Sequence, residues 1–286
     1  MNHQEKLQVY ADEVNRFLDD LSADQDGEVG EAMRYSLLGG GKRIRPVLLL
    51  VTCDMLGGDI GEALYSASAL EMVHTYSLIH DDLPCMDDDN YRRGRPSCHK
   101  RFGEATALLA GDALLTEAFS VLTMQKNSAT VKKTVALLSK AAGNSGMIHG
   151  QELDLLTEKD PSLLKEINEN KTGKLILASV MMGAACAGLE DPEKEKALKD
   201  YAVRIGEVFQ VVDDILDVTS TQEVLGKPVG SDKKNDKTTF VSMYGLDYSR
   251  EYAIKLTQEA CDALSVFGEK ADLLKWYAEQ LLVRIK

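Results

Sequence analysis

Apolar residues recur at helical spacing along most of the chain. In residues 4–20 the apolar positions Leu7, Val9, Tyr10, Val14, Phe17 and Leu18 predict an amphipathic helix. Further helices are predicted for residues 47–57, 62–80, 102–124, 131–157, 163–170, 175–188, 193–218 and, in part, 239–286. No stretch alternates apolar and polar residues long enough to predict a strand. We therefore expect an all-α protein, with residues 1–286 as one domain because no linker divides them.

Charge and composition narrow the functional classes. The 286 residues carry a formal net charge of −13, and no long run of Lys and Arg provides a basic face for nucleic acid. The charged N-terminus lacks a signal-peptide core, and no window holds 18 consecutive apolar residues. We expect a soluble cytoplasmic protein without stable membrane insertion. The five cysteines lack CxxC spacing, which favours buried free thiols over a disulfide or zinc framework.

Two acidic clusters interrupt this helical pattern. Residues 78–95 read LIHDDLPCMDDDNYRRGR, with five carboxylates followed by three arginines, and residues 209–217 read FQVVDDILD. Pro84 disfavours a continued helix, so residues 87–89 are expected in a loop. On the later helix Asp213, Asp214 and Asp217 crowd one side, and their mutual repulsion favours a bound cation.

Carboxylates without His or Cys partners are typical ligands of hard cations such as Mg²⁺. An EF-hand is the first alternative for the earlier cluster. With Asp87 as position 1, Arg92 and Cys98 would occupy the positions that require Gly and Glu. The EF-hand is therefore excluded.

Basic residues suggest anion binding at two further places. The sequence GGGKRIRP at residues 39–46 is either a solvated loop or an anion site, and it lacks the spacing of a P-loop. Residues 220–236 include Lys227 and are followed by Lys237; this stretch is either a mobile basic loop or a lid. Gln151 and Asp154 share a helix face, which is equally well explained as an exposed polar face.

Taken together, these motifs resemble the short-chain trans-polyprenyl diphosphate synthases of the bacterial farnesyl diphosphate synthase type. The similarity includes DDLPCMD at residues 81–87, RRG at 92–94 and DDILD at 213–217. It also includes GGGKRIRP, GQELDL, KTGK, FQVVDD, LGKPVGSD and NDKTT, all in the expected order. The resemblance implies a bundle of about ten or more helices around a deep central cavity. It further implies a homodimer and Mg²⁺ ions, three per active site, between two facing Asp motifs.

The resemblance also implies a role for individual residues. By this resemblance Asp81, Asp87 and Asp213 are direct metal ligands. Asp82, Asp214 and Asp217 support these ligands or bind the metal through water. The residues expected to bind the allylic diphosphate are Arg92, Lys171, Lys227 and Lys237. Those expected to bind isopentenyl diphosphate are Gly40, Lys42, Arg45, His74 and Arg93. Thr172 and Gln210 would line the carbocation, so the catalytic set comprises Asp81, Asp82, Asp87, Lys171, Thr172, Gln210 and Asp213. His74 by itself would be read as a core histidine, while His80 and His149 receive no role.

Product length is predicted from Tyr76 and Ser77. At about 1.5 Å per residue, Tyr76 lies roughly 7 Å before Asp81 along the same helix, where its ring could close the cavity. In the resembling family, an aromatic residue here together with the inserted Pro84 and Cys85 fits a C15 product. We expect farnesyl diphosphate from dimethylallyl or geranyl diphosphate, with geranyl or geranylgeranyl diphosphate as the alternative products.

Two other functional classes are weighed against this interpretation. A class I terpene cyclase would also ionise an allylic diphosphate, but it needs no second diphosphate site. The GGGKRIRP motif and the two Asp motifs therefore argue against a cyclase. A noncatalytic partner subunit would be expected to lack Asp or Arg residues in its motifs, and none is missing here.

Overall fold

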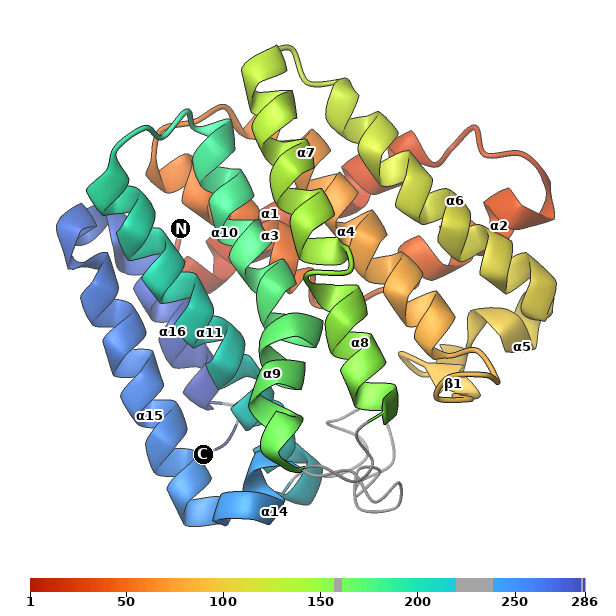
Figure 1. Cartoon of the computed structure of the whole chain (residues 1–286). Helices are drawn as coiled ribbons and strands as arrows, with labels where there is room; N and C mark the ends of the chain where they lie inside the picture. Colours follow the sequence, from red (N-terminus) through yellow and green to blue (C-terminus); the bar gives the residue numbers. More distant parts are fainter. Residues whose placement is uncertain (157–160, 220–238, 284, 286) are drawn as a thin grey trace. The chain divides into compact units, whose positions relative to one another are not determined.

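The computed structural model describes residues 1–156, 161–219, 239–283 and 285. The described elements are almost all helical, which confirms the predicted fold class (Figure 1). The chain folds into two compact units, one formed by residues 1–135 and 185–187, the other by residues 136–184 and 188–286. The assignment of residues 1–286 to one domain stays a prediction, and each unit is described by itself.

The first unit is organised around helix α4 (Ile60–Asp81), which packs against α1, α2, α3 and α6. The other helices are α1 (His3–Leu21), α2 (Gly27–Leu37), α3 (Ile44–Met55), α5 (Cys98–Phe102), α6 (Glu104–Thr123) and the first part of α7 (Ser128–Ala142). Apolar and small residues let α4 be buried on most sides. At its crossing with α6, a Cβ on Gly111 would lie 2.0 Å from Nε2 of His80, so glycine allows this close approach.

A two-stranded ladder in this unit corrects the prediction that no stretch forms a strand. Strands β1 (Tyr91–Arg92) and β2 (Arg95–Pro96) pair antiparallel. Their two connecting residues, Arg93 and Gly94, both have positive φ, which is the backbone of a type I′ hairpin turn. The strands are too short to produce an alternating pattern, so periodicity could not reveal them.

The second unit is organised around α11 (Pro192–Thr219), which packs against η2, α14, α15, η3 and α16. Its elements are the end of α7, α8 (Met147–Leu156), the 3₁₀ turn η1 (Pro161–Leu163), α9 (Leu164–Asn168), the π-helical turn η2 (Glu169–Gly173), α10 (Lys174–Cys186), α14 (Phe240–Tyr244), α15 (Leu246–Ala263), the 3₁₀ segment η3 (Leu264–Ala271) and α16 (Asp272–Val283). Each unit therefore contains a long central helix that carries an acidic cluster at or near its C-terminal end.

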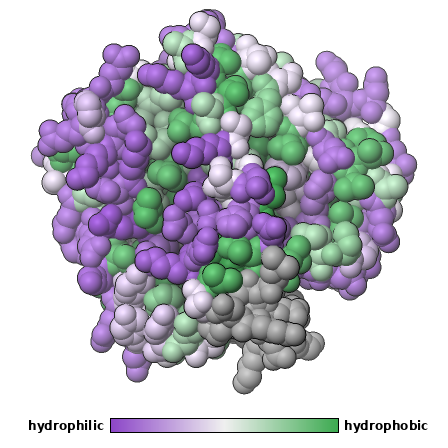
Figure 2. Space-filling model, in the orientation of Figure 1, coloured by the Kyte–Doolittle hydropathy of each residue, from purple (hydrophilic) through white to green (hydrophobic). Residues whose placement is uncertain are grey.

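On the face that Figure 2 shows, the coloured residues are a mixture of hydrophilic residues and smaller hydrophobic areas. Within the part of the chain that the structure describes, α6 is the one helix long and apolar enough to cross a membrane by length and composition alone. Core helices of globular proteins pass the same test. On α6, Leu108 and Leu109 are 47% and 53% exposed.

Candidate functional site

The first acidic cluster lies where α4 ends. The helix stops at Asp81, and Pro84 follows in a turn that brings the chain back. The backbone N–H of Asp87 donates to the carbonyl of Asp81 at 2.9 Å. Asp87 is exposed and Asp81 is half-buried. The structure thus places Asp87 in a loop, as predicted, and holds its backbone against the helix end.

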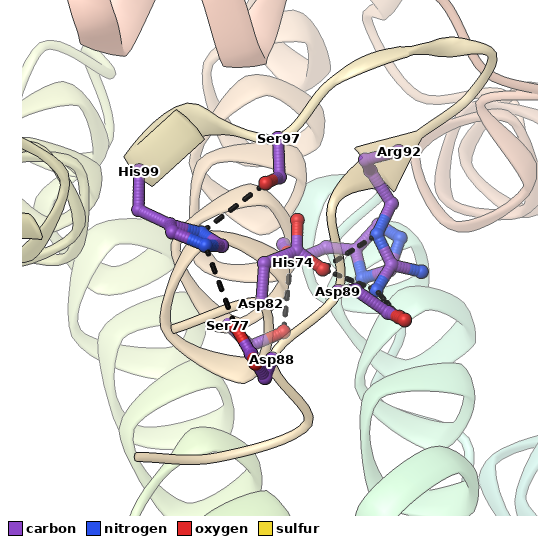
Figure 3. Close-up of polar contacts among 8 residues, drawn as sticks. All are labelled: His74, Ser77, Asp82, Asp88, Asp89, Arg92, Ser97 and His99. Atoms are coloured by element: carbon purple, nitrogen blue, oxygen red, sulfur yellow. Dashed lines mark hydrogen bonds and ion pairs between the residues drawn. The ribbon is translucent and has the colours of Figure 1, made fainter. Parts of the chain in front are cut away.

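Asp82 has different surroundings from Asp81. Its side chain is 2% exposed and accepts hydrogen bonds from Nε of Arg92, at 2.9 Å, and from an Nη of the same guanidinium. Arg92 also reaches Asp89 at 3.0 Å (Figure 3). Burial raises the pKa of Asp82 above its ordinary value, although the bonds from Arg92 act in the opposite direction. Asp82 therefore fixes the position of Arg92.

A buried histidine supports the same loop. His99 lies between Ser97 and Asp88, with Nδ1 3.2 Å from the Ser97 hydroxyl and Nε2 3.9 Å from a carboxylate oxygen of Asp88 (Figure 3). Asp88 has a positive φ of 49°. His99 was not predicted as part of the site, because a lone His gives no motif.

The glycine-rich loop meets the hairpin at its basic residues. Gly40 and Gly41 have φ values of 89° and 124°, and the guanidinium of Arg93 donates to the carbonyl of Gly40. A Cβ on Gly41 would lie 2.7 Å from Cζ of Arg93, so a larger residue there would displace the guanidinium. Gly40 and Arg93 are more than fifty residues apart in the sequence, and their contact brings the glycine-rich loop and the hairpin together as one basic surface.

Helix α4 adds His74 to this basic surface. Its Nε2 lies 3.4 Å from Nη1 of Arg45. Burial, and then the positive charges of Arg45 and Arg93, hold the pKa of His74 well below its ordinary value. His74 is thus neutral near pH 7 and can share hydrogen bonds without adding charge. Exposed Lys42 lies on the same loop.

In the second unit, three predicted residues join in a chain of hydrogen bonds. The hydroxyl of Thr172 donates to Oε1 of Gln210 at 3.3 Å, and Nε2 of Gln210 donates to Oδ1 of Asp214 at 2.9 Å. The other oxygen of Asp214 accepts from the backbone N–H of Phe240 at 2.7 Å. Asp214 and Asp217 are 4% and 2% exposed, whereas Asp213 is half-buried. Asp214 therefore links α11 to α14.

Lys171 has a partner that the sequence did not assign. Its Nζ lies 2.6 Å from Oδ2 of Asp154 on α8. Lys171 belongs to η2, and a Cβ on Gly150 would lie only 2.2 Å from its backbone nitrogen. The shared helix face of Gln151 and Asp154 was the available signal, but an exposed polar face explained it equally well.

The carboxylates fit Mg²⁺ as ligands of chemically suitable type. Among the described residues no three His, Cys, Asp or Glu side chains gather closely enough to hold an ion by themselves. Mg²⁺ is commonly bound by one or two protein carboxylates together with substrate phosphates and water. In the first unit Asp81 and Asp87, and in the second unit Asp213, are at least partly exposed, whereas Asp82 and Asp214 are buried and accept protein hydrogen bonds.

The predicted product-length residues lie on α4 before Asp81. Tyr76 is buried, its ring makes an edge contact with His80 at 5.7 Å between centroids, and its hydroxyl has no hydrogen-bond partner among the described residues. Burial, followed by the charge of Asp81, raises the pKa of Tyr76 to about 12. The hydroxyl of Ser77 donates to the carbonyl of His74 at 2.9 Å (Figure 3). Lys227 and Lys237 lie outside the described residues.

The described helices thus carry two Asp clusters, the first of which lies beside a basic loop. Residues 26–276 match the family model described as polyprenyl synthetase. The chain belongs to this family.

Proteins of this family are similar to the chain over most of its length. The farnesyl diphosphate synthase of Micrococcus luteus is 44% identical over 290 residues, covering 99% of each chain. The large subunit 1 of a chloroplastic heterodimeric geranylgeranyl pyrophosphate synthase from Arabidopsis thaliana is 47% identical, over 90% of this chain and 72% of that protein. A geranyltransferase from Helicobacter pylori, solved with magnesium and isoprenyl diphosphate, is 36% identical, with a TM-score of 0.84 over 97% of this chain and 96% of the other.

Proposed function

We propose that this protein condenses isopentenyl diphosphate with an allylic diphosphate to give a longer prenyl diphosphate. One observation carries the proposal: the second half of α4 joins two different sites. His74 lies with Arg45 and Arg93 on a basic surface, and Asp81 and Asp82 follow about two turns later with Arg92. A basic surface and a separate acidic cluster suit two diphosphates, one bound by cations alone and one bound through metal.

The reaction separates charge, so the residues act chiefly by electrostatics. The allylic carbon–oxygen bond breaks and its electron pair leaves with the diphosphate. The double bond of isopentenyl diphosphate then supplies the pair for the new carbon–carbon bond, and loss of a proton restores a neutral chain. Oriented cations and dipoles lower the barrier because they stabilise the departing negative charge.

The residue assignments from the resemblance are kept as part of this proposal. Asp81, Asp87 and Asp213 would hold Mg²⁺, which would neutralise charge on the leaving diphosphate when bound. The three-ion stoichiometry remains part of the proposal. Asp82 and Asp214 act through their partners, Arg92 and Gln210, whose side chains they orient. Neutral His74 and the guanidinium of Arg45 would share the isopentenyl diphosphate.

Farnesyl diphosphate is the product that Tyr76 supports best. Its buried ring occupies α4 before Asp81, which would stop a growing chain at C15. A geranylgeranyl product is the second candidate, because a relative that bears that name is 47% identical. We further propose a cytoplasmic homodimer, for which the exposed leucines Leu108 and Leu109 on α6 provide an apolar contact surface.

One assay tests the proposal directly. Purified protein is incubated with Mg²⁺, isopentenyl diphosphate and each allylic primer in turn, and the products are identified by chromatography. We expect consumption of both substrates and a main product of C15. Primer turnover without consumption of isopentenyl diphosphate would instead indicate a terpene cyclase.

The metal assignment is tested separately with Asp81→Ala. We expect turnover to fall by about two orders of magnitude or more, because a main source of charge stabilisation is lost. A near-normal rate at saturating Mg²⁺ would overturn the assignment of Asp81.

A further inference from the structure

Arg43 is a basic residue of the glycine-rich loop that does not face solvent. It lies directly after Lys42 and two residues before Arg45, yet it is only 3% exposed. Its φ of 48° places it in the left-handed region, immediately before α3 begins. A non-glycine residue holds this conformation only where its surroundings compensate for the strain.

The compensation comes from contacts on three helices. Nη1 of Arg43 lies 2.6 Å from Oε1 of Glu71 on α4, and both side chains are 1% exposed. Nη2 donates to the carbonyl of Leu37, the last residue of α2, at 2.6 Å, and Nε donates to Oδ1 of Asn15 on α1 at 2.8 Å. The loop is therefore attached to α1, α2 and α4 through a single guanidinium.

Glu71 also affects the neighbouring cations. It lies three residues before His74, so both side chains emerge on the same face of α4. Burial lowers the pKa of Arg93, and so do the positive charges of Arg43, Arg92 and Arg45, whereas Glu71 acts in the opposite direction. Glu71 thus offsets part of the repulsion among guanidiniums that gather around the loop.

We propose that the buried Arg43–Glu71 pair is a positioning device that holds the glycine-rich loop in its diphosphate-binding shape. Because Arg43 is held inward, its chain neighbours Lys42 and Arg45 are presented around Gly40, Arg93 and His74. The pair itself contacts no substrate. This inference rests on the proposed function, in which that basic surface binds isopentenyl diphosphate.

The test separates positioning from general damage to the fold. Arg43→Lys keeps the charge but cannot make all three contacts, and Glu71→Gln keeps the shape but removes the negative charge. Asn15→Ala removes only the contact to Nε and serves as a milder variant if the others fail to fold. Arg34→Lys is the matched control, because Arg34 forms a comparable but exposed pair with Asp19 in the same unit. Steady-state rates are measured with each substrate varied, and thermal unfolding is recorded for each variant.

We expect the KM for isopentenyl diphosphate to rise about 10- to 100-fold in Arg43→Lys and Glu71→Gln, as a displacement near 1 Å would produce. The KM for geranyl diphosphate and kcat should stay within about twofold of the unmodified values. Unchanged values for isopentenyl diphosphate, or a parallel change in all three constants, would overturn the inference. Arg34→Lys should leave all three unchanged.

A binding measurement keeps this outcome distinct from failure of the proposed function. Calorimetry with inorganic diphosphate, without Mg²⁺, reports on the basic surface even if the unmodified protein forms no prenyl product. Weaker binding by Arg43→Lys than by Arg34→Lys supports the positioning role in either case. Equal binding by the two variants contradicts it.

Discussion

Asp154 on α8 and Lys171 on η2 are joined by an ion pair of 2.6 Å between Oδ2 and Nζ. Both side chains are about one-quarter exposed, so the pair is partly shielded from solvent. A flexible lysine gains a defined direction from such a partner, which suits the contact with the allylic diphosphate that we propose for Lys171. The pair assigns a positioning role to the GQELDL motif, which the sequence left open.

Replacing Asp154 should therefore impair catalysis through Lys171. We predict that Asp154→Asn lowers kcat/KM for the allylic substrate by about 10- to 100-fold, because the ammonium group loses its orientation. Steady-state kinetics with geranyl diphosphate as the varied substrate provide the measurement. Glu152→Gln on the same helix is the control, since Glu152 is exposed and pairs with His149 rather than Lys171. Equal effects of the two substitutions would argue against the pair.

Tyr76 offers a test of product length. We predict that Tyr76→Ala yields products longer than C15, because removing the ring extends the apolar space along α4. The matched control is Tyr76→Phe, which removes only a hydroxyl that has no hydrogen-bond partner among the described residues and should leave the product at C15. Product chromatography is the readout, and an unchanged C15 product in Tyr76→Ala would rule out the ring as the floor.

The pair of Arg92 and Asp82 makes a prediction about stability. Arg92→Met leaves the buried carboxylate of Asp82 without its main partner, so we expect a loss of about 1–3 kcal/mol, less than for a fully buried pair because Arg92 is one-third exposed. The double variant Arg92→Met/Asp82→Asn removes the stranded charge and should recover part of this loss. Urea unfolding at pH 7 measures both. No recovery in the double variant would show that the two side chains are not coupled.

Sequence reasoning predicted the amphipathic helices well because apolar residues recur in them at regular helical spacing, as in α1 and α11. The helical pattern of residues 62–80 placed Asp81 near a helix end, and the position of Pro84 placed residues 87–89 in a loop. The β1–β2 hairpin escaped prediction because its strands have two residues each. Arg43 and Asp154 escaped for a different reason. Their motifs are equally compatible with an anion site or a solvated face, and only the fold shows that their side chains bind other parts of the chain.

Stability should fall on the acid side of neutrality because of His74. Its pKa is lowered in the folded protein, so below its ordinary value of about 6.5 the unfolded chain binds a proton that the folded chain does not. The stability that comes from a neutral His74 is therefore fully present above pH 7, and it is lost as the pH falls below about 6.5. We predict that His74→Gln reduces the loss of stability between pH 7 and pH 5. Urea midpoints of both proteins across this range check it, and parallel curves would contradict the role of His74.

The π-helical turn η2 contains one more residue than an α-helical turn would in its place. One residue of an α-helix corresponds to a rotation of about 100° about the helix axis. The side chains of η2 therefore point in other directions relative to those of α10 than they would in a continuous α-helix. Deleting a single residue such as Glu169 would restore regular phase and rotate Lys171 and Thr172 relative to α10. The length of this turn, and not only its composition, is therefore under constraint: insertions and deletions here should be tolerated far less than substitutions.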